Sequence, residues 1–457
     1  MTNSHPSTMA IPEEHVEWIT APKLSTPRVE LVNVFRMGKK IIIWAFMLLT
    51  VSTSVLAQQG KDGKKEKPKK EAVYKSKEVM KEINNHLKNY QYAKAENSFL
   101  TALRNHKDAY SDHKLYNSAV EIERQLALEQ NKNMYLENNR ADTAKFFRHI
   151  YNVYDYAIYL DSMESVPDEK GKVKYKYRSS NARKMLFFRN NLRSAGKFFY
   201  QKRLYPEAFK HIDMFIRSHD VAIITAAADT AVEHEDLVQV ATLAVLSAYA
   251  AGQYQDAVKY IDTALNDTVT NKYLLEVGAK SYAQLGDTIN GLKLLYSGVR
   301  NHPDYDYFFL TLVKYHNEHN KYQQSLKLAT HMTRQFPKSR DYWYIKGKEE
   351  LFLNLNDSAL ASFSQAVVLK ADDAESYSEM GKICLRWAQE YYRSLSAAQF
   401  NAASRKKLKA YYADACKYFE AARKYNEADR SLWLTGLREC YFNLNRGKEL
   451  RALERLK

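Results

Sequence analysis

Four lysines recur at one fixed spacing in the second half of the chain. Lys280, Lys314, Lys348 and Lys382 follow one another at intervals of 34 residues. A row of cations suits an acidic peptide or another polyanion, because complementary charges steer association across an interface. The alternative is that an exposed helix position in a basic protein is often lysine. We favour a binding role, since the stacking of repeated units does not by itself require lysine at this position.

A catalytic signature does not accompany these lysines. The chain has no GxSxG, no glycine-rich phosphate loop ending in Lys-Ser/Thr, and no HExxH. His316 and His319 have a spacing that a metal ion could use, but the pattern supplies no third ligand. Five glutamates are interpreted as charges on helix surfaces: Glu121, Glu123, Glu129, Glu349 and Glu350. The sequence therefore predicts a protein that is not an enzyme and has no cofactor or metal site.

The 34-residue step extends beyond the lysines and predicts a repeat architecture. Pro303 and Pro337 keep the step. Four small residues keep it as well: Ala257, Gly291, Ser325 and Ala359. A fixed period of this length is typical of stacked supersecondary units, each of which buries its apolar face on its neighbours. With only 14 glycines and 9 prolines in 457 residues, the units are expected to be helical, because both residues break helices.

The charge balance is strongly basic, with a formal net charge of +16. Such a balance favours anionic partners, although basic charge can also serve solubility alone. The three cysteines, Cys384, Cys416 and Cys440, show no CxxC spacing and are expected to be small buried apolar residues. Pairing of Cys384 with Cys416 is the alternative in an oxidising compartment.

The N-terminal part contains a candidate export signal. Residues 1–36 have little pattern and are interpreted as an extension before a true start at Met37. A basic start, a short apolar run and a small-residue end make residues 37–57 a predicted signal peptide, cleaved after Ala57. This predicts a periplasmic or secreted protein of the cell envelope. The alternative is an uncleaved membrane anchor at residues 41–57, which the following lysines favour.

The rest of the chain divides by composition and by the clarity of the repeat. Residues 58–77 hold eight lysines against three acidic residues and are predicted to be a disordered linker. Residues 78–180 are expected to form degenerate helical repeats, and residues 181–457 a regular array. Two insertions interrupt that array, near residues 220–236 and near residues 387–409, where about 22 residues lengthen one unit.

The repeated units resemble the tetratricopeptide repeat (TPR) family. The clearest unit has an aromatic residue, a small residue in the first helix, and small–aromatic–small in the second: Trp343, Gly347, Ala359, Phe363 and Ala366. The resemblance implies an all-α fold, a right-handed α-solenoid of stacked helix-turn-helix units. It also implies that the first helices line a concave groove into which the lysines point. By the same resemblance, neighbouring groove positions are Tyr273, Tyr307, Leu310, Tyr344 and Ser378.

These features together predict a non-enzymatic protein-interaction scaffold with a basic, tyrosine-lined groove. Its partner is expected to be a protein or an acidic peptide in the cell envelope. The export signal argues against a nucleic-acid partner. The alternative function is a glycan- or nutrient-binding component of an uptake system, a class that usually carries a lipoprotein cysteine that this sequence lacks near its signal.

Overall fold

The computed structural model describes residues 74–136, 141–226 and 234–456. The chain divides into two compact units, Met1–Glu71 and Ala72–Lys457, and the second is described by itself. The predicted extension (1–36), signal peptide (37–57) and most of the linker (58–77) lie outside the described residues. Part of the insertion near 220–236 does so too. Among the described helices, none is long and apolar enough to cross a bilayer.

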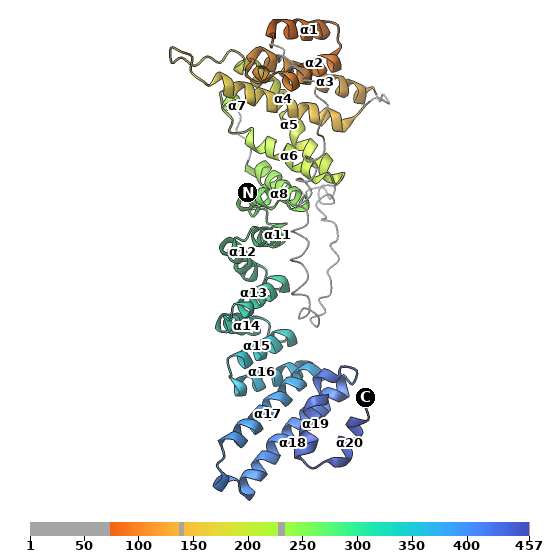
Figure 1. The fold of residues 1–457 in the computed structure, drawn as a ribbon, viewed down its shortest axis with the longest axis vertical. Coiled ribbons are helices and arrows are strands. Elements are labelled where there is room, and N and C mark those ends of the chain that lie inside the picture. Colours follow the sequence, from red (N-terminus) through yellow and green to blue (C-terminus); the bar gives the residue numbers. More distant parts are fainter. Residues whose placement is uncertain (1–73, 137–140, 227–233, 457) are drawn as a thin grey trace, which may run out of the picture. The chain divides into compact units, whose positions relative to one another are not determined.

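The second unit is all-α, which confirms the predicted fold class (Figure 1). No strand occurs in the ranges that the structure describes. The helices in chain order are α1 (Ser76–Lys88), α2 (Tyr92–Asn105), η4 (Lys107–Ser111), α3 (His113–Tyr135), α4 (Thr143–Glu164), α5 (Arg178–Gln201), α6 (Tyr205–Arg217), α7 (Ala222–Thr225), α8 (His234–Ala250), α9 (Tyr254–Lys259), α10 (Ile261–Ala264), α11 (Asn271–Gln284), α12 (Thr288–Asn301), α13 (Asp306–Glu318), α14 (Tyr322–Gln335), α15 (Arg340–Phe352), α16 (Asn356–Leu369), α17 (Ala374–Ser394), η5 (Ala397–Gln399), α18 (Ala402–Tyr425), η6 (Arg430–Leu432), α19 (Leu434–Asn443) and α20 (Gly447–Glu454).

These helices pack in consecutive pairs. α11 packs on α12, α13 on α14, α15 on α16, and α17 on α18. The second helix of each pair also contacts the first helix of the next pair, so that the chain passes from unit to unit without a crossover. This is the arrangement that a repeated helix-turn-helix unit produces.

The turn inside each pair has a fixed backbone conformation. Gly252, Gly286, Asn320 and Asn354 are 34 residues apart, and each has a positive φ between 57° and 74°. Left-handed backbone is accessible at little cost to glycine and is tolerated by asparagine, which explains the residue types at this position. The repeat is thus visible in the backbone as well as in the side chains.

Close approach of the two helices explains the small residues of the first helix. A Cβ atom added to Gly347 would lie 2.8 Å from Phe363 of the partner helix, closer than a side chain can pack. Gly381 has the same relation to Phe419, also at 2.8 Å. The first pair is separated by 16 residues in the sequence and the second by 38, a difference of 22. The extra residues therefore lie between the two contact points, in the ends of α17 and α18 and in η5.

The core consists of the helix faces that the repeat pattern marks. Ala257, Gly291, Ser325 and Ala359 are all buried. The aromatic stripe of α4 contributes Phe146, Phe147 and Tyr154 to the core. Cys384, Cys416 and Cys440 are free and buried, as expected of small apolar residues, and burial raises the pKa of the Cys384 and Cys416 thiols to about 12.

Candidate functional site

The lysine column, which is Lys280, Lys314, Lys348 and Lys382, lies on the first helices of four successive pairs. These helices are α11, α13, α15 and α17. Each lysine makes an ion pair with a glutamate. The four pairs differ in burial and in distance, and those differences decide which lysines remain available to a ligand.

Lys348 and Lys382 are brought together by one carboxylate. The Nζ atoms of Lys348 and Lys382 lie 3.1 and 3.2 Å from Oε1 of Glu379 on α17. The Glu379 side chain is only 11% exposed, whereas those of the lysines are 35% and 48% exposed. Burial alone would raise the pKa of Glu379, but the two lysines outweigh it and hold that pKa below its ordinary value. Two cations and one anion leave a net charge of +1 at this cluster.

Lys280 belongs to a more closed arrangement. Its ammonium pairs with Glu276, one turn earlier on α11, and lies 5.0 Å from the centre of the Tyr307 ring. The Tyr305 hydroxyl donates to the other Glu276 oxygen at 2.6 Å. Glu276 is therefore held by two groups, and the charge of Lys280 is compensated on the spot.

Lys314 is the most accessible member of the lysine column. Its side chain is 67% exposed, and its ammonium lies 4.0 Å from Glu318, at the outer limit of an ion pair. An exposed pair of this kind contributes about 0–1 kcal/mol, because water and salt screen it. Lys314 can therefore exchange its partner at little cost.

The predicted groove tyrosines are partly buried and support the helix packing. Tyr273 and Tyr307 pack against the core between α11 and α13, and burial raises the pKa of Tyr307 to about 12. Tyr344 packs on the Phe363 ring at 5.6 Å and lies under the Arg340 guanidinium at 4.5 Å. Of these three rings, only that of Tyr307 has a recorded contact with a lysine of the column.

Two further groove positions have different outcomes. Leu310 is exposed, as a ligand-contacting position should be. Ser378 is fully buried, and its hydroxyl donates to the carbonyl of Leu432 at 2.6 Å. The prediction for Ser378 is wrong, because η6 packs over this part of α17.

Polar contacts link the first helices of successive pairs. Asn317 donates to Oε1 of Glu349 at 2.8 Å, and the Tyr342 hydroxyl donates to Asp306 at 2.6 Å. Arg340 binds Asp373, the residue that precedes α17, through two nitrogens. These partners are 32, 36 and 33 residues apart. Together with Lys348–Glu379 and Tyr305–Glu276 they form the one-period links, polar contacts about one repeat apart.

Three of the glutamates interpreted as surface charges are buried, so that interpretation is wrong for Glu123, Glu349 and Glu350. Glu350 is held by Lys346 at 2.8 Å and by the Ser362 hydroxyl at 2.6 Å. Burial raises the pKa of Glu349 to about 7, an effect that Asn317 and Lys348 reduce but do not cancel. The assumption that the lysines have no structural role is also wrong, because Lys280, Lys348 and Lys382 pair with buried carboxylates.

His316 and His319 do not converge on a common point. The Nε2 atom of buried His316 lies 2.6 Å from the Tyr296 hydroxyl, while Nδ1 of exposed His319 lies 2.7 Å from the carbonyl of Tyr315. Burial lowers the pKa of His316, which favours its neutral form. The two histidines therefore serve helix packing and helix capping.

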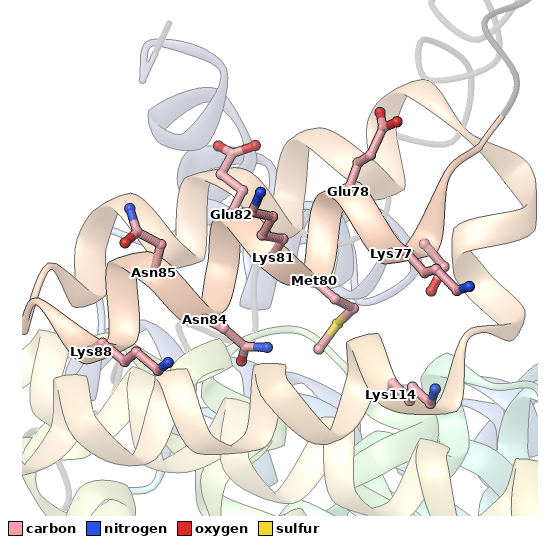
Figure 2. Close-up of a pocket in the computed structure, with 10 residues that line it drawn as sticks. Lys77, Glu78, Met80, Lys81, Glu82, Asn84, Asn85, Lys88 and Lys114 are labelled. Carbon is pink, nitrogen blue, oxygen red and sulfur yellow. The ribbon is translucent and has the colours of Figure 1, made fainter.

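A pocket of about 980 Å³ lies beside α1, far along the chain from the lysine column (Figure 2). Lys77, Lys81, Lys88 and Lys114 line it together with Glu78, Glu82 and four uncharged residues. Figure 2 shows Glu78 and Glu82 on the side of α1 away from Lys114. The lining side chains surround the helix and do not point to one centre, so the pocket has no geometry for catalysis.

Comparison with known proteins adds little beyond the fold. No family model matches the chain, and no curated protein matches it. The solved structure "MamA AMB-1" covers 43% of this chain and 92% of its own, at 15% identity and a TM-score of 0.29. A second, "MamA 41-end from Desulfovibrio magneticus RS-1", covers 42% of this chain and 97% of its own, at 12% identity and a TM-score of 0.30.

Likeness at these TM-scores carries no argument about function. The class of the protein is therefore taken from its own helix pairs, its 34-residue turn geometry and its one-period links. The fold and the lysine column together define a TPR-like helical repeat protein.

Proposed function

We propose that this protein is a non-enzymatic scaffold that binds an acidic peptide segment of a protein partner through the lysine column. The observation that carries the proposal is the cluster of Lys348, Lys382 and Glu379. One buried carboxylate serves two partly exposed lysines there, and one positive charge is left for a ligand. Lys314, one pair earlier, adds a second accessible cation.

The expected binding mode follows from these differences in exposure. An acidic side chain of the partner would pair with Lys314, and a second would pair with Lys348 or Lys382. Leu310, exposed between Lys280 and Lys314 in the sequence, would supply apolar contact. Lys280 would contribute least, because Glu276 already compensates its charge. Binding of this kind is steered by charge and is expected to weaken as salt concentration rises.

A labelled glutamate-rich decapeptide is a direct probe, with fluorescence anisotropy as the measurement. The double variant Lys314→Glu/Lys348→Glu should weaken binding at least about tenfold, equivalent to about 1.4 kcal/mol. The matched control is Lys293→Glu/Lys327→Glu, which alters two exposed lysines of the second helices α12 and α14, also 34 residues apart. This control changes the net charge equally and should bind almost as the unaltered protein does.

Equal losses in the two double variants would show that only net charge matters and would contradict the assignment to the lysine column. A circular dichroism spectrum of each variant shows that the helices are intact. If neutral oligosaccharides bind on a glycan array and the glutamate-rich peptide does not, the uptake-system alternative is favoured instead.

We further propose that the scaffold works in the cell envelope, after cleavage of residues 37–57. What supports this is the basic–apolar–small order of that segment. N-terminal sequencing of the exported protein should find a first residue near Gln58. A protein that retains residues 41–57 in the membrane fraction would instead support the anchor.

A further inference from the structure

Three side chains from three different helices meet in the N-terminal part of the second unit. Glu96 comes from α2, Glu123 from α3 and His149 from α4. Each offers one ligand atom, and the three atoms lie within 4.8 Å of one another. The residues are 27 and 26 positions apart in the sequence, so no local motif announces this meeting.

Burial makes this cluster unlike a chance group of surface acids. The Glu123 side chain is only 2% exposed, and Ile122 and Leu126 beside it on α3 belong to the apolar core. The His149 side chain is 13% exposed, and its Nδ1 atom lies 2.7 Å from Oε2 of Glu123. Glu96 is partly buried and closes the cluster from α2. Burying a carboxylate is costly unless a cation or several hydrogen bonds compensate it.

The cations that compensate other buried carboxylates are missing at this one. In the part of the chain that the structure describes, neither Glu96 nor Glu123 has an ion pair with lysine or arginine. Glu121, two positions before Glu123, pairs with both Arg124 and Lys184. Two carboxylates thus face a single imidazole, which can offset at most one negative charge.

We propose that Glu96, Glu123 and His149 bind one divalent transition-metal ion of the zinc class. Carboxylate oxygen and imidazole nitrogen are ligands that Zn²⁺ takes at about 2.0–2.2 Å, and three protein ligands leave one position for water. Ligand atoms around such an ion are roughly 3.3 Å apart. The Glu123 and His149 atoms therefore separate slightly on binding, and the metal ion replaces the proton that they share.

The ion joins helices of two successive pairs. α2 ends the first pair, while α3 and α4 form the next, so the ion connects the pairs at the same place where one-period links act further along the chain. The role is structural, and the expected consequence is a rise in the thermal unfolding temperature on metal addition.

The experiment uses the full chain without an affinity tag, treated with a chelator and then titrated with ZnCl2. Isothermal titration calorimetry should show one tight site per chain, and the unfolding temperature should rise with it. Glu96→Gln, which alters the ligand nearest the surface, should weaken binding at least tenfold. The matched control is Glu82→Gln, because Glu82 faces His86 at 3.8 Å on exposed α1. That variant should bind as the unaltered protein does.

Two results would overturn the proposal. One is the absence of a one-to-one site in the unaltered protein, and the other is equal binding by Glu96→Gln and Glu82→Gln. If Glu96→Gln fails to fold, X-ray absorption spectroscopy of the unaltered protein with zinc still decides the matter. A first shell of oxygen with one nitrogen supports the proposal, and a shell containing sulfur from Cys384, Cys416 or Cys440 contradicts it.

Discussion

The helices α11–α17 and the helices α1–α6 stabilise buried polar groups in different ways. In α11–α17, the one-period links join residues 29 to 36 positions apart, and each connects a first helix to the next. In α1–α6 the separations scatter: 26 for His149–Glu123, 17 for Arg178–Asp161 and 64 for His211–Phe147. Regular spacing of polar contacts thus accompanies regular spacing of the helices.

The difference teaches that the repeat fixes where a partner lies, but not which partner it is. Each one-period link uses a different pair of residue types, from Tyr–Glu to Arg–Asp. Stacking brings the same places together in every unit, and the sequence fills them anew each time. Where the spacing is irregular, as in α2–α4, a carboxylate can lie beyond the reach of lysine or arginine.

The largest effect is expected from breaking the Arg340–Asp373 link. Arg340→Met leaves the Asp373 carboxylate, which is 2% exposed, without its cation, and removal of one member of a buried pair costs about 3–5 kcal/mol. Urea denaturation should show this loss in the free energy of unfolding. Arg423→Met is the control, because Arg423 pairs with a largely exposed Glu427, and its effect should stay within about 0.5 kcal/mol. Similar effects for the two variants would mean that the one-period links do not stabilise the array.

A smaller, pH-dependent effect is expected at Glu349. Its pKa of about 7 in the folded protein exceeds the ordinary 4.5, so the folded state binds the proton more tightly. Its contribution to stability is therefore fully present below pH 4.5 and is lost as pH rises towards 7. Glu349→Gln, which stays neutral, should be more stable than the unaltered protein at pH 8 by about 1–2 kcal/mol, and not at pH 4.5.

The opposite sign at Glu379 provides the comparison for that experiment. Its pKa is lowered in the folded protein, so its contribution is present at neutral pH and is lost on acidification. Glu379→Gln should therefore be less stable than the unaltered protein at pH 8. Urea denaturation of both variants at two pH values measures the two signs. Equal shifts in the same direction would show that Lys348 and Lys382 do not determine the charge state of Glu379.

The smallest effect is expected at Lys314. Lys314→Ala removes an exposed ion pair at the distance limit, and the free energy of unfolding should change by less than about 0.5 kcal/mol. Thermal unfolding followed by circular dichroism is sufficient to measure this. A larger loss would mean that Lys314 takes part in the fold like Lys348, and would remove it from the set of residues free to bind a ligand.

The sequence predicts those features that depend on period and residue size. Helical class, the small residues at Gly347 and Gly381 and the buried cysteines all follow from patterns along the chain. The burial of Glu123 and Glu349 does not, because a glutamate on a helix has the same local sequence whether water or the next unit faces it. A search for polar residues about one period apart, such as Asn317 and Glu349, would have indicated part of it.

The lengthened pair α17–α18 shows how a repeat array can grow in one place without changing its step. The extra 22 residues divide into about eleven for each helix, close to three full turns at about 3.6 residues per turn. An addition of whole turns preserves helical phase, so the same side of each helix still faces its partner. Trp387 and Tyr391 accordingly meet Tyr411 across the extension, at ring distances of 6.3 and 6.1 Å. Insertions in multiples of about eleven residues per helix are thus a length increment that this architecture can absorb.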